Sequence, residues 1–119
     1  MASPPDRRAH ARRHIDPGLG VHATFRDSRI DARVIDISLV GVLVEVPAAD
    51  VDALPGLNAP IGIELRLGAG APLECDGRVA WLGGHHRHGE RHYRAGLAFG
   101  TCDEAQQARL TAFIDALPE

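Results

Sequence analysis

The segment ARVIDISLVGVLVEV, from Ala32 to Val46, decides the fold. Most of its residues are apolar and many are β-branched, which favours β-strands packed in a core. Asp36, Ser38 and Gly41 interrupt the apolar run at spacings of two and three residues. Polar groups are costly in a core unless they find hydrogen-bond partners. The segment therefore predicts two strands joined by a short polar connection. Asp36, Ser38 and Gly41 in and beside this connection are the first candidates for function.

Alternation of apolar and polar residues continues on both sides of this segment and predicts six strands in all. Their apolar positions fall within Val21–Phe25, Ile30–Ile37, Val42–Val46, Ile61–Leu67, Leu73–Trp81 and Tyr93–Phe99. Odd-numbered residues of the fifth strand share one face, so Trp81 is expected on the same side as Val79. Six short strands separated by turn residues predict an all-β domain, a six-stranded antiparallel barrel.

The last part of the chain, at about 102–117, predicts one α-helix that closes the barrel. Thr101 and Glu104 have the spacing of a capping box, which marks a helix start. An apolar stripe follows at helical spacing, formed by Leu110, Phe113, Ile114 and Leu117.

Residues 1–18 differ from the rest because they hold prolines, a glycine, much charge and little apolar material. We interpret them as a flexible, arginine-rich N-terminal arm that leads into a domain at 19–119. All 13 basic residues of the chain are arginine, and seven of them lie in the first 33 residues. A total of 119 residues suits one domain.

Composition narrows the classes of function. The net charge of −3 argues against a general binder of nucleic-acid polymers. No apolar stretch approaches the roughly 18 residues of a membrane span, and the start lacks the apolar core of a signal peptide, so we expect a cytoplasmic protein. Cys75 and Cys102 lack CxxC spacing and are expected to be reduced, inert thiols. A nucleophile elbow, a P-loop and an HExxH motif are all missing from the sequence, so we expect no enzyme.

DISLVG, Asp36 to Gly41, has two interpretations. Asp36 and Ser38 are two apart, so in an extended chain their side chains share a face, and Gly41 permits a positive φ or the close approach of another molecule. The plainer interpretation is a β-turn held by hydrogen bonds from aspartate and serine side chains to the backbone.

RRAHAR, Arg7 to Arg12, is the second candidate. Arg8 and Arg12 are four residues apart, and Arg7 and Arg13 lie beside them. A guanidinium offers a planar fork that matches phosphate oxygens or the edge of guanine. The alternative is a solvated basic arm without a specific role.

In this order, the two motifs resemble those of the PilZ domain family. The resemblance extends to DGRVAW, Asp76 to Trp81, and to AGLAF, Ala95 to Phe99, and it covers the chain from Asp6 to Leu117. It implies a split barrel with a closing helix. It also implies a receptor for cyclic di-GMP, a bacterial second messenger with two guanines and two phosphates. Cyclic di-GMP would be the ligand, and no cofactor is expected.

The resemblance assigns a role to each motif residue. Arg8 and Arg12 would grip phosphate and guanine, and Arg7 would add positive charge. Asp36 would accept hydrogen bonds from the N1–H and amino group of a guanine, while Ser38 would contact phosphate or base. Gly41 would let the ligand lie against the turn.

GGHHRHGERHY, Gly83 to Tyr93, is rich in histidine, and imidazole suits several transition metals. No ordered carboxylate or cysteine partner is evident, and the glycines indicate a loose hairpin loop. We therefore expect no metal site.

Three functions remain in competition. The first is a cyclic di-GMP receptor that changes conformation and signals to a downstream protein partner, as a monomer or homodimer. The second is an interaction adaptor of the same fold that binds no nucleotide. The third is a small barrel that binds single-stranded nucleic acid, against which the 4% content of aromatic residues argues.

Overall fold

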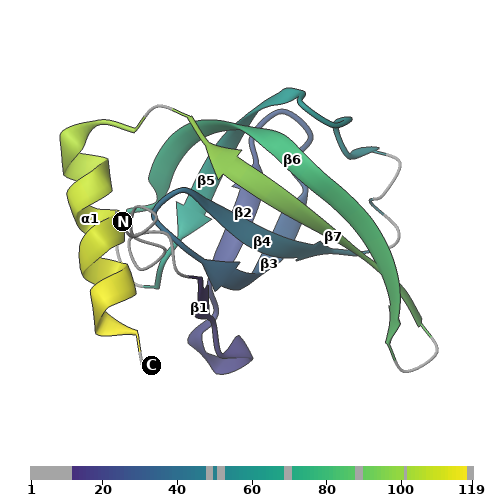
Figure 1. Cartoon of the computed structure of the whole chain (residues 1–119), viewed down its shortest axis with the longest axis horizontal. Coiled ribbons are helices and arrows are strands. Elements are labelled where there is room, and N and C mark those ends of the chain that lie inside the picture. Colours follow the sequence, from purple (N-terminus) through teal and green to yellow (C-terminus); the bar gives the residue numbers. More distant parts are fainter. Residues whose placement is uncertain are drawn as a thin grey trace, which may run out of the picture.

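The computed structural model describes residues 12–47, 50, 53–68, 71–87, 90–100 and 102–117. In chain order its elements are β1 (Arg13–His14), the 3-10 helix η1 (Pro17–Leu19), β2 (His22–Phe25), β3 (Asp31–Ile37), β4 (Gly41–Val46), β5 (Pro60–Arg66), β6 (Leu73–Arg87), β7 (Glu90–Phe99) and α1 (Glu104–Ala116). Figure 1 shows α1 along one side of the barrel, while the hairpin of β6 and β7 extends away on the opposite side.

Six of the strands close into an antiparallel barrel, as the sequence predicts. Hydrogen-bonded neighbours run in the order β3, β2, β5, β6, β7, β4, and the pairing of β4 with β3 closes the ring. β1 is an additional strand that pairs with the end of β3, where His14 lies opposite Asp36. Ile15 follows β1 and is buried in the core. The chain thus contributes to the sheet and the core before residue 19, and the domain boundary at that residue stays a prediction.

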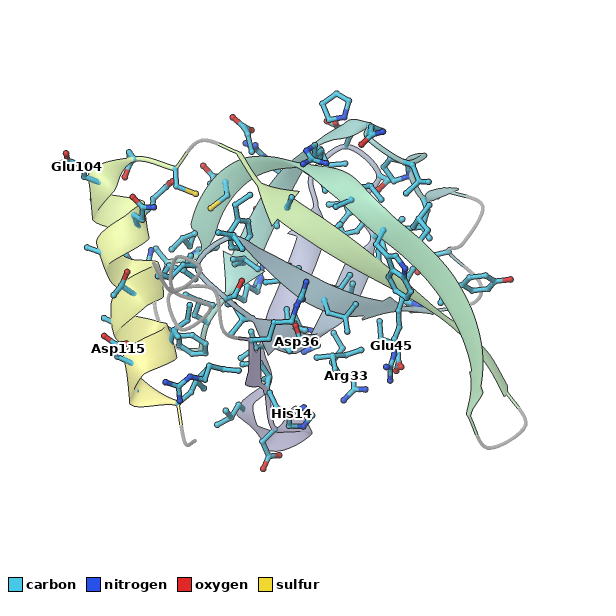
Figure 2. The ribbon with its side chains drawn as sticks, viewed as in Figure 1. His14, Arg33, Asp36, Glu45, Glu104 and Asp115 are labelled. Atoms are coloured by element: carbon cyan, nitrogen blue, oxygen red, sulfur yellow. The ribbon has the colours of Figure 1, made fainter. Side chains whose placement is uncertain are left out.

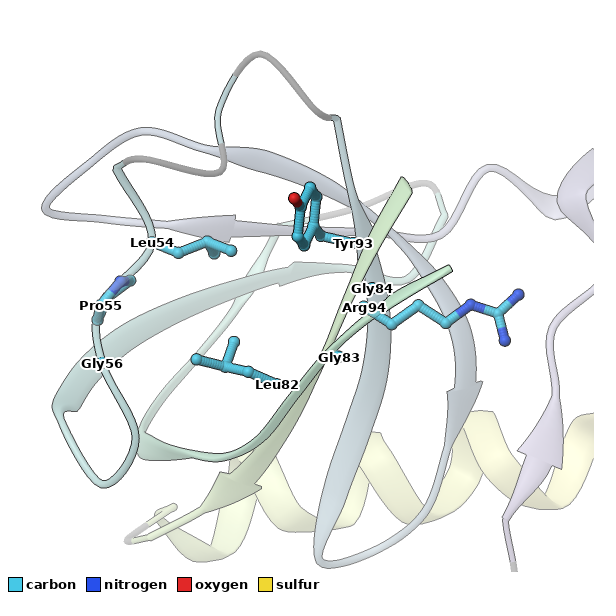
Figure 3. A pocket seen from close by; sticks show the side chains of 8 residues that line it. All are labelled: Leu54, Pro55, Gly56, Leu82, Gly83, Gly84, Tyr93 and Arg94. Carbon is cyan, nitrogen blue, oxygen red and sulfur yellow. The ribbon is translucent and has the colours of Figure 1, made fainter. Parts of the chain in front are cut away.

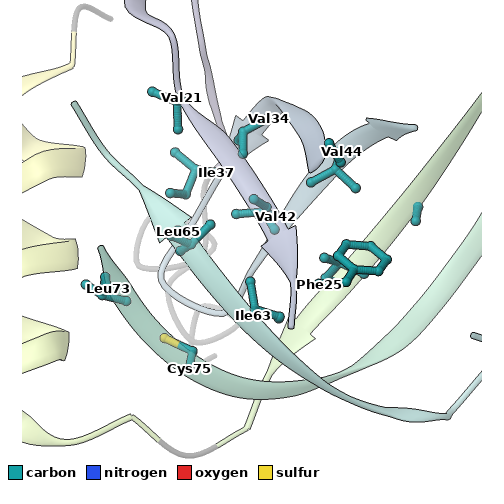
Figure 4. Close-up of a cluster of buried hydrophobic side chains, with 14 of the residues drawn as sticks. Val21, Phe25, Val34, Ile37, Val42, Val44, Ile63, Leu65, Leu73 and Cys75 are labelled. Carbon is teal, nitrogen blue, oxygen red and sulfur yellow. The ribbon is translucent and has the colours of Figure 1, made fainter. Parts of the chain in front are cut away.

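Aliphatic side chains from all six barrel strands fill the interior. Figure 4 shows Val34 and Val42 there, together with Ile63 and Leu65 of β5. Phe25, at 1% exposure, is the largest of the fully buried side chains. Burial of each such side chain contributes about 1.5–3 kcal/mol, so this core holds the outer wall in place.

β3 carries a one-residue bulge at Ile35. Val34 pairs with Val44 and Asp36 pairs with Leu43, which leaves Ile35 without a partner on β4. A bulge shifts the alternation of a strand by one residue. Val34 faces the core, and Asp36, two residues later, faces outward instead of inward.

β6 carries a second bulge, at Ala80. Val79 pairs with Leu97 and Trp81 pairs with Gly96, so Ala80 has no partner on β7. The expectation that Trp81 shares the inner face with Val79 is wrong. The bulge turns Trp81 outward, where the residue is 50% exposed.

β6 and β7 continue beyond the barrel as a two-stranded ribbon. Their register pairs His85 with His92 and Arg87 with Glu90. The predicted loose loop at Gly83–Tyr93 is thus β-structure up to residue 87 and again from residue 90. The glycines do not end the strands because the two strands satisfy each other's backbone hydrogen bonds.

α1 begins one residue after its N-cap, Asp103, whose side chain accepts a hydrogen bond of 2.8 Å from the backbone N–H of Gln106. Thr101, the predicted cap, lies outside the described residues, and Asp103 fills the cap position instead. The apolar stripe is confirmed: Leu110, Ile114 and Leu117 are buried, and Phe113 packs partly buried against the core. In the part of the chain that the structure describes, no helix is long and apolar enough to cross a bilayer.

Candidate functional site

A row of outward-facing residues crosses the barrel wall at the level of the two bulges. Cross-strand pairing joins Trp81 to Gly96, Gly96 to Leu43, Leu43 to Asp36 and Asp36 to His14. We call these five residues the outer row. Along the sheet, three strand spacings, about 14 Å, separate the backbone of Trp81 from that of Asp36. The wall thus presents a stacking surface at one end of the row and a hydrogen-bond acceptor toward the other.

Two glycines make room for the Trp81 side chain. A Cβ atom at Gly83 would lie 2.6 Å from two ring carbons of Trp81, and one at Gly96 would lie 3.2 Å from its Cβ. The ring therefore lies against the backbone of Gly83. The sequence analysis did not single out Trp81, because the alternation put it on the same face as Val79. The glycine two residues later is the signal that a ring could lie over that position.

Arg12 and Asp36 join the two sequence motifs. Arg12 Nη1 donates to Asp36 Oδ1 at 2.7 Å, with side-chain exposures of 55% and 18%. The residues are 24 positions apart in sequence. Because Arg12 directly precedes β1, the pairing of β1 with β3 brings the end of the arginine motif to the outer row.

Ser38 lies in the turn between β3 and β4 and is 2% exposed. Its hydroxyl accepts from the backbone N–H of Val40 at 3.2 Å and donates to the carbonyl of Gly41 at 3.4 Å. The Ser38 backbone N–H also donates to that carbonyl, at 2.9 Å. This half of the plainer interpretation is correct, since the serine holds a turn.

Gly41 begins β4 and pairs with Ala98 of β7. A Cβ at this position would overlap the carbonyl oxygen of Leu97. Gly41 is not among the described residues with positive φ. Glycine is required here because the β7 backbone approaches closely.

A second charged row lies beside the outer row. Glu45 of β4 accepts from Arg33 at 3.2 Å and lies 3.7 Å from Arg94 Nε. Glu45 is the cross-strand partner of both arginines. Figure 2 shows Arg33, Asp36 and Glu45 on the same face of the barrel. The flanking arginines add positive charge beside the wall.

The remaining motif arginines, Arg7 and Arg8, lie outside the described residues, so their predicted roles stay predictions. Arg26 offers a useful contrast. Its Nη2 donates to Asp76 at 2.9 Å, so it is also an exposed arginine paired with an aspartate. It lies at the end of β2, across Gly62 of β5, and takes no part in the outer row.

A hollow of about 350 Å³ lies between the connection after β4 and the base of the ribbon. Figure 3 shows Leu54, Leu82 and Tyr93 around it, while the Arg94 guanidinium extends away. A mostly apolar lining without an inward-pointing cation offers no opposite charge to an anionic ligand.

Metal chemistry finds no support among the residues that can be assessed. Within the described residues, no group of three or more histidine, cysteine, aspartate or glutamate side chains could hold a metal ion. The side chains of the histidine-rich segment, 85–92, are not described, so the expectation of no metal site there stays a prediction.

Comparison with known proteins agrees with the architecture. The PilZ domain family matches residues 6–116. A flagellar brake protein YcgR of Thauera aminoaromatica is 35% identical over 86 residues, covering 71% of this chain and 32% of that protein. The chain thus spans about a third of the length of this curated relative.

Solved structures share the fold at low identity. The PilZ domain of YcgR from Escherichia coli with c-di-GMP has a TM-score of 0.70 at 17% identity, covering 94% of this chain and 92% of that one. The MrkH–c-di-GMP complex of K. pneumoniae has a TM-score of 0.76 at 16% identity, covering 92% and 51%. The inhibitor of motility MotI/DgrA of Bacillus subtilis has 0.71 at 15%, covering 91% and 49%.

Proposed function

Because the chain belongs to the PilZ domain family, we propose that it is a receptor for cyclic di-GMP that changes conformation on binding and signals to a protein partner. Two of the structural neighbours, those of YcgR and MrkH, contain c-di-GMP. Both sequence motifs of a ligand-binding member are present in this chain. The proposed role is that of a receptor or adaptor in the cytoplasm, without catalysis.

The observation that carries this proposal is the contact between Arg12 and Asp36 on the outer wall. A turn-forming DxSxxG segment needs no arginine, and a loose basic arm needs no aspartate. Their meeting at 2.7 Å supports a shared site. Exposed ion pairs contribute about 0–1 kcal/mol, so a ligand can displace this contact at small cost.

Cyclic di-GMP matches the chemistry of the outer row. A guanine can stack on the exposed Trp81 ring, and base–aromatic stacking contributes about 1–3 kcal/mol. The Asp36 carboxylate can accept from guanine N1–H and the amino group once Arg12 turns from carboxylate to ligand. Arg12, with Arg7 and Arg8, then binds phosphate and the guanine edge. Gly96 adds no side chain to the row between Trp81 and Leu43.

Signal transmission follows from the position of the arm. Fixing the backbone of each arm residue costs about 1–2 kcal/mol. Hydrogen bonds to charged groups contribute about 1.5–3 kcal/mol each and must offset that cost. In this proposal the ligand orders the residues that precede β1. A partner protein then recognises the surface that these residues form.

Calorimetric titration of Arg8→Lys, Arg12→Lys and Arg26→Lys with cyclic di-GMP tests this proposal. Lysine keeps the charge but loses the bidentate fork, so the first two variants should bind at least about tenfold more weakly than wild type. Arg26→Lys is the matched control and should bind like wild type. GMP and an oligonucleotide serve as ligand controls. Equal binding by all three variants would mean that Arg8 and Arg12 contribute only their positive charge and make no specific contact with the ligand.

A nucleotide-free adaptor is the second candidate. It is favoured by the structural roles of Ser38 and Gly41, which hold the β3–β4 turn and admit the β7 backbone without any ligand. A protein of this fold could therefore keep the DxSxxG motif even if it no longer bound a nucleotide. Folded wild-type protein that produces no heat with cyclic di-GMP would favour this adaptor.

A further inference from the structure

Cys75 and Cys102 meet across the junction of barrel and helix. Their Sγ atoms lie 2.7 Å apart, and both are free thiols. A disulfide bond is about 2.05 Å long, so a small movement of the side chains would join them. They are 27 residues apart in sequence, which is why their spacing gives no sign of the pair.

The backbone holds the two cysteines in register. Cys75 lies on β6 and is 2% exposed. Gly77 pairs with Phe99, and the N–H of Gly100 donates to the carbonyl of Asp76 at 2.7 Å. Cys102 follows two residues after Gly100. The end of β7 therefore delivers Cys102 to the wall beside Cys75 whether or not the thiols react.

Their exposures differ. Cys102 is partly exposed and lines an open groove of about 340 Å³ between the β3–β4 turn and α1. Burial, and then the hydrogen bond with the Cys102 thiol, raise the pKa of Cys75 far above its ordinary value. The thiolate is the reactive form of cysteine. Cys102 is therefore placed to react first and Cys75 second.

We propose that Cys75 and Cys102 form a reversible intramolecular disulfide that fastens the start of α1 to the barrel under oxidising conditions. This pair is a redox modification site, and it needs no bound nucleotide. The disulfide would pin the residue just before the helix cap, at the groove that also includes Leu39 and Val40 of the β3–β4 turn.

A low-molecular-weight disulfide such as oxidised glutathione is a sufficient oxidant. The Cys102 thiolate attacks one sulfur of glutathione disulfide, forms a mixed disulfide and releases one glutathione thiolate. Cys75 then attacks Cys102 Sγ, its proton passes to solvent, and the second glutathione thiolate leaves. Two protein thiols are oxidised, and one glutathione disulfide is reduced to two thiols.

Peptide mapping of the full chain after incubation with oxidised glutathione tests the proposal. Trypsin cleavage after Arg66, Arg78, Arg94 and Arg109 separates the cysteines into fragments 67–78 and 95–109. Without reductant, these two fragments should appear joined, and dithiothreitol should separate them. Melting of the oxidised protein should occur at least about 5 °C higher than that of the reduced protein, because the cross-link restricts the unfolded chain.

Cys102→Ser is the control variant, since the partly exposed position tolerates a hydroxyl better than the buried Cys75 does. It should melt at the temperature of the reduced wild type and show no increase with oxidant. Disulfide-linked dimers, a stable glutathione adduct on Cys102, or unmodified thiols after incubation would each overturn the proposal.

Discussion

β3 and β5 are both seven-residue strands, and burial follows the same pattern over their first four residues. Their sixth residues nevertheless face opposite sides of the sheet. Burial alternates without interruption along the middle of β5, and its sixth residue, Leu65, is fully buried. In β3 the bulge at Ile35 resets the alternation, and its sixth residue, Asp36, faces outward. One unpaired residue thus converts a core position into a position on the outer wall of the barrel.

The same device recurs in β6. The bulge at Ala80 sends Trp81 outward, and the β-ladder then places it in line with Asp36 across β7 and β4. Two independent bulges therefore place Trp81 and Asp36 in the same outer row. Bulges are common next to functional sites because they redirect side chains without disturbing the core.

The largest change in stability is expected when the sixth residue of each strand is replaced by the type found in the other. Leu65→Asp places a carboxylate in the core without a partner and should cost more than about 4 kcal/mol, enough to unfold the domain. Asp36→Leu should change stability by less than about 1 kcal/mol because the side chain faces outward. Urea denaturation measures both. Similar losses for the two variants would contradict opposite facing.

A smaller loss of stability is expected at the turn that follows β3. Gly41→Ala would overlap the Leu97 carbonyl and should cost about 1–3 kcal/mol, as overpacking does. Gly56→Ala is the matched control, since a Cβ there meets nothing within 4 Å. It should be neutral or stabilise by up to about 1 kcal/mol. Thermal melts of the pair decide whether close packing or ligand approach explains the glycine, and equal melting temperatures would favour ligand approach.

Asp36→Ala should weaken the binding of cyclic di-GMP but leave the stability of the fold unchanged. The variant should stay folded and lose about 1.5–3 kcal/mol of cyclic di-GMP affinity, the range for a hydrogen bond to a charged group. Calorimetry on the variant and on Asp76→Ala, which removes the partner of Arg26, separates the outer row from other exposed aspartates. Undiminished affinity in Asp36→Ala would leave the aspartate a structural residue.

The smallest effect concerns Arg12 and the stability of the free protein. Arg12→Ala removes an exposed ion pair and should change the free energy of unfolding by no more than about 1 kcal/mol. High salt should reduce even this difference. A loss of several kcal/mol in denaturation would mean that Arg12 is part of the framework and is not available to a ligand.

Much of the fold could be predicted from the sequence because apolar alternation is continuous in most strands. The barrel, the inner faces of β4 and β5 and the stripe on α1 all follow from it. The bulges could not be predicted. Val34 and Ile35 are both apolar and Ala80 is small, so nothing marks the residue that leaves the ladder.

The candidate site was predictable only in part, for the same reason. Residue type and spacing single out Asp36, Ser38, Gly41 and the arginine motif, and the structure brings Arg12 to Asp36. The binding roles of these residues stay predictions. Trp81 was misplaced, because its outward position depends on a backbone irregularity. β1 was missed because two residues carry no periodicity, although Ile15 beside it is a core residue.

Trp81 is the only tryptophan in the chain, so its fluorescence reports directly on the outer row. Fluorescence titration with cyclic di-GMP is therefore the most direct test of the central claim, that two bulges build a ligand-binding wall. We predict a saturable change in Trp81 emission with cyclic di-GMP, which GMP does not reproduce and which Asp36→Ala shifts to higher ligand concentration. Unchanged emission from folded protein at saturating cyclic di-GMP would contradict the account.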